Sequence, residues 1–243
     1  MAEALRLRLS GTATASSAAT LVGVFGVVLE AFPEGALWWD EQRLLVVADL
    51  HLEKGSAFAR RGQMIPPYDT VETLSRLARL IARLNPRAVI ALGDSFHDSQ
   101  GAANLSASDR AAVMGLQTGR EWIWISGNHD PERPAGLDGM AADQIAIGKL
   151  VFRHEPLVGA AEGEIAGHLH PCARVYGRGK SVRRKCFAGD GMRMILPAFG
   201  AYTGGLDILD SAFDGLFSPR SFRAFMLGYD RIYAVGRRAL RAG

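Results

Sequence analysis

All six histidines of the chain lie in five short segments that also carry carboxylate or amide side chains. The segments are Asp49-Leu50-His51, Gly93-Asp94-Ser95-Phe96-His97-Asp98, Gly127-Asn128-His129-Asp130, Phe152-Arg153-His154-Glu155-Pro156 and Gly167-His168-Leu169-His170-Pro171. In an extended segment, side chains two residues apart point to the same face, so His168 and His170 form an imidazole pair. Histidines scattered over a surface would rarely cluster in this way, and we therefore expect a site that uses all five segments.

Asp, His and Asn without thiolates are ligands that suit divalent metals such as manganese, iron or zinc. Cys172 and Cys186 lack the paired spacing of a structural zinc site. The segments hold too many ligands for one ion and enough for two, with Asp94 as the natural shared carboxylate. Two neighbouring ions can activate a bridging water as hydroxide and stabilise an in-line displacement at phosphorus. The residues thus predict phosphoester hydrolysis.

Apolar runs precede three of these segments and are typical of buried strands. The expected strands span residues 43–50, 87–94 and 121–128, and the expected helices between them span residues 68–85 and 107–119. In the first helix the apolar face is expected to contain Val71, Leu74, Leu77, Ala78, Ile81 and Leu84. The tryptophans Trp38, Trp39, Trp122 and Trp124 are expected to pack in the core. Polar residues at the ends of such strands are where α/β folds build their sites.

After about residue 148 the pattern changes to short strands without helices between them. An αβ half followed by a β half predicts an α/β fold, a four-layer α/β/β/α sandwich of two mixed sheets flanked by helices. We expect one domain over residues 1–243, because no repeat or low-complexity linker divides the chain.

The charge of the chain is nearly balanced, with 28 Lys and Arg against 25 Asp and Glu, but its distribution is uneven. Six basic residues and no acid lie between positions 174 and 185. Such a cluster can bind polyanions, or it can be a solvated strand face. The predicted substrate contacts, including two outside this cluster, are Lys54, Arg174, Arg178, Lys180, Arg183, Arg184 and Tyr202.

The remaining composition argues against a membrane protein and against a disulfide scaffold. The longest apolar run, residues 21–32, is shorter than the roughly 20 residues that a spanning helix needs. Two cysteines suit a reducing compartment, and we expect a cytoplasmic protein. A homo-oligomer is among the open alternatives.

Together the five segments resemble the motifs of the calcineurin-like metallophosphoesterases. The resemblance implies that Asp49, His51, Asp94 and His170 hold one metal, and that Asp94, Asn128, His154 and His168 hold the other. It also implies that His129 is catalytic, contacting the phosphoryl oxygen or protonating the leaving group. Manganese is the first choice for both ions, with iron and zinc as alternatives.

A finer resemblance covers nearly the whole chain. DLHLEKGS, LGDSFHD, FRHEP, GHLHP and PAFGAYTGGL look like the bacterial PdeM-type phosphoesterases, known as ligase-associated DNA damage response endonucleases. Many related phosphatases carry Asp or Asn at the position of His97, whereas SbcD-type repair nucleases carry a histidine there as this chain does. His97 is expected to orient His129 or to contact the phosphate. The resemblance implies DNA as a partner and a functional association with an ATP-dependent DNA ligase.

Two other functions remain open at this point. The same metals could hydrolyse small phosphoesters, such as a cyclic nucleotide or a nucleotide-linked metabolite. A binding scaffold without catalysis would show eroded ligands, and no ligand of the motif set is missing here. The sequence thus favours a two-metal phosphodiesterase, expected to act as a nuclease in DNA repair.

Overall fold

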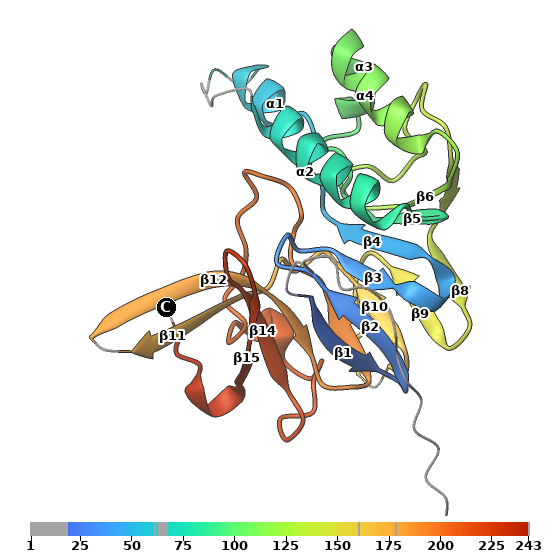
Figure 1. The fold of residues 1–243 in the computed structure, drawn as a ribbon. Helices are drawn as coiled ribbons and strands as arrows, with labels where there is room; N and C mark the ends of the chain where they lie inside the picture. Colours follow the sequence, from blue (N-terminus) through green and yellow to red (C-terminus); the bar gives the residue numbers. More distant parts are fainter. Residues whose placement is uncertain (1–18, 61, 63–67, 160, 178, 243) are drawn as a thin grey trace, which may run out of the picture.

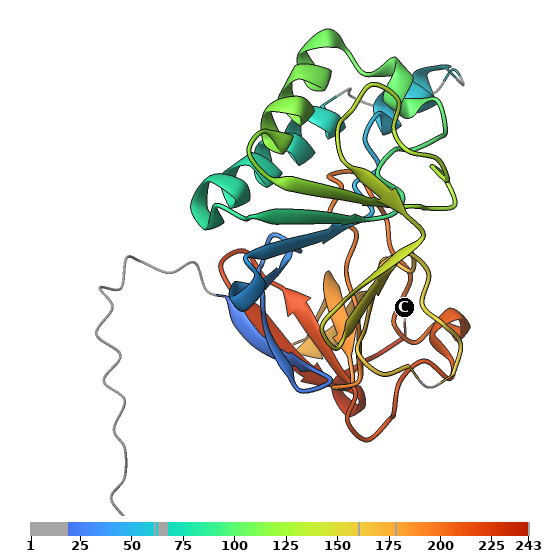
Figure 2. The same ribbon diagram turned by 90° about the vertical axis from the view of Figure 1, so that its right-hand side faces the viewer.

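The protein consists of two β-sheets packed face to face, with helices on one outer side (Figures 1 and 2). The computed structural model describes residues 19–60, 62, 68–159, 161–177 and 179–242. The predicted substrate contact Arg178 lies outside these residues. Among the helices described, none is long and apolar enough to cross a membrane.

The first sheet has seven strands in the order β1-β2-β3-β4-β5-β6-β7. Their bounds are β1 Thr20–Val24, β2 Val27–Ala31, β3 Leu37–Trp39, β4 Leu44–Ala48, β5 Ala88–Leu92, β6 Glu121–Ile125 and β7 Met140–Ala142. Strands β4 to β7 pair in parallel, whereas β1 to β4 pair antiparallel. The apolar run at residues 21–32 is therefore a hairpin, with Phe25 and Gly26 at positive φ in its turn.

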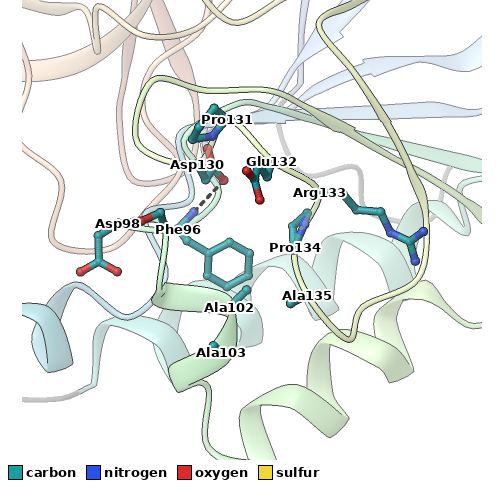
Figure 3. A pocket seen from close by; sticks show the side chains of 11 residues that line it. Phe96, Asp98, Ala102, Ala103, Asp130, Pro131, Glu132, Arg133, Pro134 and Ala135 are labelled. Carbon is teal, nitrogen blue, oxygen red and sulfur yellow. Dashed lines mark hydrogen bonds between the residues drawn. The ribbon is translucent and has the colours of Figure 1, made fainter.

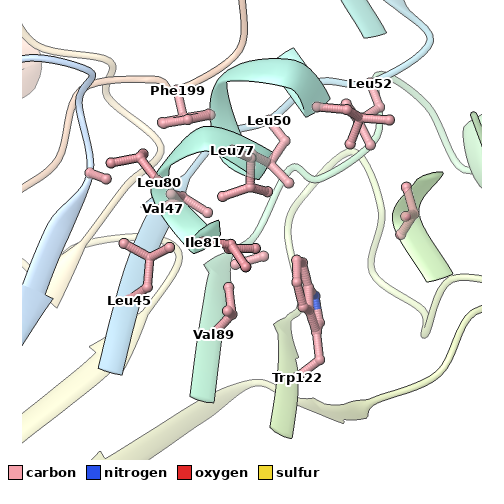
Figure 4. Packing of buried hydrophobic residues seen from close by; sticks show 14 of the residues in the cluster. Leu45, Val47, Leu50, Leu52, Leu77, Leu80, Ile81, Val89, Trp122 and Phe199 are labelled. Carbon is pink, nitrogen blue, oxygen red and sulfur yellow. The ribbon is translucent and has the colours of Figure 1, made fainter. Parts of the chain in front are cut away.

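α-Helices cover the outer face of this sheet, and the first of them packs against the second rather than on the sheet (Figure 2). Their bounds are α1 Lys54–Arg60, α2 Asp69–Leu84, α3 Gly101–Asn104 and α4 Ala107–Gln117. Figure 4 shows Leu77, Leu80 and Ile81 of α2 over the sheet. The helix ends at Asn85, which is left-handed (φ 44°) and donates its backbone N–H to Ile81.

The buried face of α2 differs in part from the expected one. Leu74, Leu77 and Ile81 are buried as predicted, but Val71 is 52% exposed. Leu80, which the predicted face omitted, is buried instead. The predicted apolar face of six residues is wider than the area of α2 that contacts the sheet, so Val71 at the edge of this face stays exposed to solvent.

The second sheet has the order β15-β14-β12-β13-β10-β9-β8, and β11 pairs with β12 outside this path. The bounds are β8 Gln144–Ile147, β9 Leu150–Arg153, β10 Glu164–Ala166, β11 Cys172–Gly177, β12 Lys180–Gly189, β13 Arg193–Ile195, β14 Arg223–Leu227 and β15 Ile232–Gly236. Strand β10 runs parallel to β9 and β13, and the remaining pairs are antiparallel. Residues 186–189 of β12 pair with β14 in the sheet, whereas residues 180–185 pair with β11 and form a hairpin that projects from the body of the sheet (Figure 1).

The period-2 alternation of the strands separates three apolar layers. Leu45 and Val89 of the first sheet face the helices, whereas Val46 and Ile90 face the second sheet. In the second sheet Phe187, Met194 and Phe225 point inward toward the first sheet. Their neighbours Ala188, Ile195, Ala224 and Met226 point outward, against a layer that contains Ile208, Phe213 and Leu240.

The predicted α/β fold class is confirmed, but the fourth layer, on the outer side of the second sheet, differs from the predicted layer of helices. Among the described residues, the outer side of the second sheet is covered by coil and by the 3₁₀ helices η2 (Ser211–Phe213) and η3 (Arg237–Ala239) instead of α-helices. The four tryptophans expected in the core are 3–5% exposed and buried as predicted. The sequence pattern did not reveal β1, β2, β14 or β15. The apolar run of β1 and β2 is divided by the turn at Phe25 and Gly26, and β14 and β15 lack the uniformly apolar runs of β4 to β6.

Replacing Leu77 with Ala should lower the free energy of unfolding by about 2–5 kcal/mol, because Leu77 is 0% exposed at the centre of the α2 contact. Val71→Ala on the same helix should change it by no more than about 0.5 kcal/mol. Urea denaturation of both variants measures the difference. Equal losses would show that the exposed and buried sides of α2 are wrongly assigned.

Candidate metal centre

The five histidine segments follow the carboxyl ends of β4, β5, β6, β9 and β10 and meet at one edge of the two sheets. Two groups of side chains have their ligand atoms within 4.8 Å of one another. One group is Asp49, His51 and His170, and the other is Asp94, His154 and His168. These are the residues that the sequence predicts as ligands, apart from Asn128, which lies beside the second group.

In the first group, imidazole nitrogens and a buried carboxylate face one another. His170 Nε2 lies 3.3 Å from Asp49 Oδ1 and 3.3 Å from His51 Nε2. Asp49 is 0% exposed, and both of its carboxylate oxygens accept the backbone N–H of His168. The backbone thus holds the carboxylate in place while one oxygen faces the imidazole.

The second group is centred on His154. Its Nε2 lies 3.4 Å from Asp94 Oδ1, 3.1 Å from His168 Nδ1 and 2.9 Å from Asn128 Oδ1. Its Nδ1 lies 2.9 Å from the Leu92 carbonyl oxygen, which fixes the ring orientation. Four potential ligand atoms from four segments therefore converge on one point.

Asp94 lies between the two groups and faces both. Its Oδ1 is near His154, while its Oδ2 lies 3.8 Å from His51 Nε2 and 3.9 Å from His129 Nε2. The backbone N–H of His129 donates to Oδ1 at 3.0 Å. This position is the one that a bridging carboxylate would need, although bridging itself stays a prediction.

The donor set fits two divalent ions. In the first group His170 Nε2 lies 3.3 Å from each of the other two ligand atoms, and the few protons available cannot satisfy the lone pairs of all three. A cation at their centre would accept every lone pair, and the same holds for the second group. Imidazole and carboxylate donors without sulfur match manganese, iron or zinc, as the sequence predicts.

The protonation states of the ligand side chains follow from burial and from their neighbours. Burial and the proximity of His170 lower the pKa of His51 to about 3, so its imidazole is neutral, the form that binds metals. Burial raises the pKa of Asp94, but the hydrogen bond and charge of His154 outweigh this and lower it to about 2.

His154 takes the opposite direction from His51. Burial lowers its pKa, but the hydrogen bond to Asp94 and the charges of Asp49 and Asp94 raise it to about 9. A proton therefore balances the two carboxylates in the absence of a cation. Metal binding would displace this proton.

The backbone at the ligands is unusual. Asp49, His51, Asp94, His168 and His170 all have positive φ, between 43° and 68°, a region that L-residues rarely adopt. Two glycines allow the ligand segments to approach closely. A Cβ on Gly127 would lie 2.3 Å from Asp94 Oδ1, and one on Gly93 would lie 2.4 Å from His154 Nδ1.

The two histidines predicted to be catalytic lie side by side above the ligands. His129 and His97 are stacked, with ring centroids 5.8 Å apart and an interplanar angle of 16°. The ring of His51 is 5.5 Å from that of His129 and 5.9 Å from that of His97. The side chain of His129 is 44% exposed, so it is accessible to a substrate.

The segment 197–205 runs along the same edge of the sheets. Its Phe199 and Gly200 donate backbone N–H groups to Ala48 and Asp49. Three basic side chains bind its carbonyl groups: Lys54 donates to Tyr202, Arg76 donates to Phe199, and Lys185 donates to Ala198 and Gly200. Tyr202, predicted as a substrate contact, is 36% exposed.

Lys185, which the sequence places in the basic cluster, points into the protein toward the segment 197–205. Its ammonium group also donates to Thr203 Oγ1 at 2.6 Å. Burial and the charge of Arg76 lower the pKa of Lys185 to about 8. Neither Lys185 nor Arg76 could be recognised from the sequence as holding this segment, because charge alone does not show which way a side chain points.

The remaining basic cluster is divided between the two faces of the β11–β12 hairpin. Arg174 pairs with Arg183, and Arg183 Nη2 donates to the Gly205 carbonyl, close to His170. By the strand alternation, Lys180 and Arg184 lie on the opposite face, where Arg184 covers the ring of Tyr229. Lys180 and Arg184 are therefore not on the face that leads to the ligands, contrary to the expectation of one patch.

A pocket of about 370 Å³ lies between α3 and the segments that follow β5 and β6 (Figure 3). Asp130 at its edge accepts the backbone N–H groups of Ser95 and Phe96 with Oδ2. Burial raises the pKa of Asp130 to about 7. Asp130 thereby ties the segment that carries Asp94 to the segment that carries Asn128.

Comparison with known proteins points to one family. A model of the family described as calcineurin-like phosphoesterase matches residues 42–190. The structure resembles that of Pseudomonas putida nuclease MPE, with 28% sequence identity, a TM-score of 0.69, and coverage of 89% of this chain and 100% of that chain. Yfce, a phosphoesterase from E. coli, aligns with a TM-score of 0.38 and 16% identity over 82% of this chain and 96% of that chain. No curated protein matches.

Asp94→Asn should reduce the metal content and abolish phosphoester hydrolysis, because an amide cannot supply two negatively charged oxygens to two ions. The exposed Asp214→Asn, on the outer layer of the second sheet, is the matched control. Metal per chain after dialysis is measured by atomic emission beside turnover of a small diester. Two retained ions with near-normal turnover would exclude the bridging role.

Lys185→Met should change the pH dependence of stability. Burial lowers the pKa of Lys185 from 10.5 in water to about 8, so its charged form destabilises the folded state; this loss of stability is fully present below pH 8 and disappears as the pH rises toward 10.5. From pH 7.5 to 10, wild type should therefore gain about 2 kcal/mol of unfolding free energy relative to Lys185→Met. The exposed Lys149→Met should show no such trend in urea denaturation. A constant difference would mean that Lys185 titrates as in solvent.

Proposed function

The chain belongs to the calcineurin-like phosphoesterase family and is a metal-dependent phosphoesterase, and from this premise we propose that its substrate is DNA. We assign it the hydrolysis of phosphodiester bonds with two divalent ions, manganese first. Bound ions would acidify a water molecule and neutralise charge on the phosphoryl oxygens. Asp49, His51, Asp94, Asn128, His154, His168 and His170 would hold them.

The observation that carries this proposal is the basic face of the β11–β12 hairpin. The hairpin begins two residues after His170, and the Arg183 guanidinium reaches Gly205, which adjoins the His170 backbone. Arg174 lies beside Arg183 on the same face. A strand of DNA whose scissile phosphate lies at the ligands would have its next phosphates over these guanidinium groups, which bind phosphate in a bidentate way.

The similarity to a nuclease supports the same substrate class, since the likeness extends over the full length of that protein. A role in DNA repair and a functional association with an ATP-dependent DNA ligase rest on the motif resemblance alone, and they depend on DNA being the substrate. A cytoplasmic location is also part of the proposal, and it rests on the composition of the chain with its two cysteines.

We assign to His129 the role of the acid that donates a proton to the leaving oxygen. Its Nε2 faces Asp94 Oδ2 at 3.9 Å, so a proton on this nitrogen points toward the region between the two ligand groups. His97, stacked on its ring, limits its rotation. A positioned imidazole acid contributes roughly 10²- to 10⁴-fold in rate.

The test of the substrate class compares the two faces of the hairpin. Arg174→Gln with Arg183→Gln should raise KM for DNA and reduce the salt slope of binding by roughly 0.7 units per lost contact on single strands. Lys180→Gln with Arg184→Gln removes the same charge from the opposite face and should have little effect. Hydrolysis of a small chromogenic diester should be unchanged in both pairs.

If both pairs of substitutions change KM for DNA and the salt slope equally, the basic cluster is a solvated strand face and not a DNA-binding surface. If wild type, reconstituted with manganese, iron, magnesium or zinc, cleaves cyclic nucleotides or monoesters but no DNA, the enzyme is instead a hydrolase of small phosphoesters. Both results are obtained from one substrate panel.

His129→Ala should lose turnover and keep both ions, since His129 is not needed to complete either ligand group. The loss should be greater on a diester with an alkoxide leaving group than on a nitrophenyl diester, because nitrophenolate departs without a proton. Metal content and turnover on both substrates are measured together. Loss of an ion, or an equal loss of rate on both substrates, would reject the acid role.

A further inference from the structure

A second concentration of positive charge lies away from the metal centre, at the far end of the second sheet. A pocket of about 530 Å³ is lined by four arginines, Arg220, Arg223, Arg237 and Arg238, together with Pro219, Gly236 and Ala239. Arg220 lies just before β14 and Arg223 is the first residue of that strand, whereas η3 after β15 supplies the other two arginines. The pocket therefore depends on the pairing of β14 with β15.

The four guanidinium groups lack a counter-charge within the pocket. None of the residues that line it is acidic, and no ion pair joins the four arginines to a carboxylate within the ranges that the structure describes. Arg223 lies opposite Gly236 in the strand register, and a Cβ on Gly236 would be 3.8 Å from its Nη1. An anion would offset the mutual repulsion of the four groups.

The pocket is too far from the ligands to contact the scissile phosphate. Strand β12 runs from Lys185, which binds the segment beside Asp49, to Gly189, which pairs with Arg223. Four residues of strand span about 13 Å, and the pocket lies beyond that. A ligand that fills the pocket would therefore be separate from the bond that is cleaved, or part of a long chain.

The C-terminal segment connects the pocket to the basic face of the hairpin. After η3, the backbone N–H of Arg241 donates to the Arg174 carbonyl, and Leu240 bridges to Val175. The guanidinium of Arg241 donates back to the carbonyl of Arg238 at 2.9 Å. Arginines thus follow one another from the pocket along the edge of β11 to Arg174 and Arg183, next to the ligands.

We propose that the pocket of Arg220, Arg223, Arg237 and Arg238 is a second phosphate-binding site, which holds the backbone of a nucleic acid strand whose scissile phosphate lies at the metal centre. Four guanidinium groups spread over this volume suit several phosphates of one chain better than a single small anion. The proposal rests on the proposed function, because it requires a polymeric phosphodiester as the substrate.

The test removes two of the arginines and varies the length of the substrate. In Arg237→Gln with Arg238→Gln, KM for an oligonucleotide of about 20 residues should rise on the order of tenfold at low salt, and its salt slope should fall by roughly one unit. Hydrolysis of a dinucleotide and of a small chromogenic diester should be unchanged, because neither reaches the pocket. Arg237→Lys with Arg238→Lys should recover most of the loss by keeping the charge.

Arg87→Gln with Arg231→Gln is the matched control, since it removes the same net charge from two exposed, ion-paired arginines elsewhere. If the control raises KM as much as the pocket variant, the effect is one of net charge and the site is refuted. Unchanged KM in the pocket variant, with normal DNA cleavage by wild type, would reject the pocket alone. A wild type that hydrolyses the small diester but no oligonucleotide would reject the DNA substrate and the pocket together.

Calorimetric titration with tripolyphosphate separates the two sources of phosphate. Binding that is lost in Arg237→Gln with Arg238→Gln, while KM for the long oligonucleotide stays normal, would identify a site for free oligophosphates and overturn the strand proposal. Loss of both supports a site that recognises phosphates of a chain.

Discussion

The main constraint on this structure is that it buries two carboxylates, Asp49 with 0% and Asp94 with 3% of its surface exposed. Ionised groups in such positions need nearby positive charge or hydrogen-bond donors. The backbone supplies some donors, through His168 and His129, and the surrounding imidazoles supply the rest. The other side chains around the site are arranged so that these two carboxylates stay close to each other and to five histidines.

This constraint explains why the ligands come from the ends of strands rather than from helices. Parallel strands bring their carboxyl ends to one edge, so β4 and β5 place Asp49 and Asp94 in adjacent segments. The second sheet contributes His154 after β9 and His168 and His170 after β10, again a parallel pair. The tight turns that aim these side chains inward require the left-handed backbone and the glycines at Gly93 and Gly127.

Much of this arrangement was accessible from the sequence, because strand ends and residue types are local signals. The uniformly apolar β4, β5 and β6 and the periodic α2 were predicted within a few residues, and the ligand segments were found by their composition. The exposure of Val71, the inward turn of Lys185 and the strands β14 and β15 were not, since each depends on contacts between distant segments. The division of the basic cluster between the two faces of the β11–β12 hairpin was predictable in part. Once residues 180–185 are known to form a strand, the alternation of side chains places Arg183 and Arg184 on opposite faces.

The strained ligand segments also link the protein's stability to its metals. Five ligand residues have a backbone that L-residues rarely adopt, and a positively charged His154 is held between two buried carboxylates. Ions that bind only the folded state would stabilise it by mass action. A chain synthesised where divalent metals are scarce would unfold more often and be degraded faster. In a cell, the amount of this enzyme would then follow metal supply, and not only the rate at which it works.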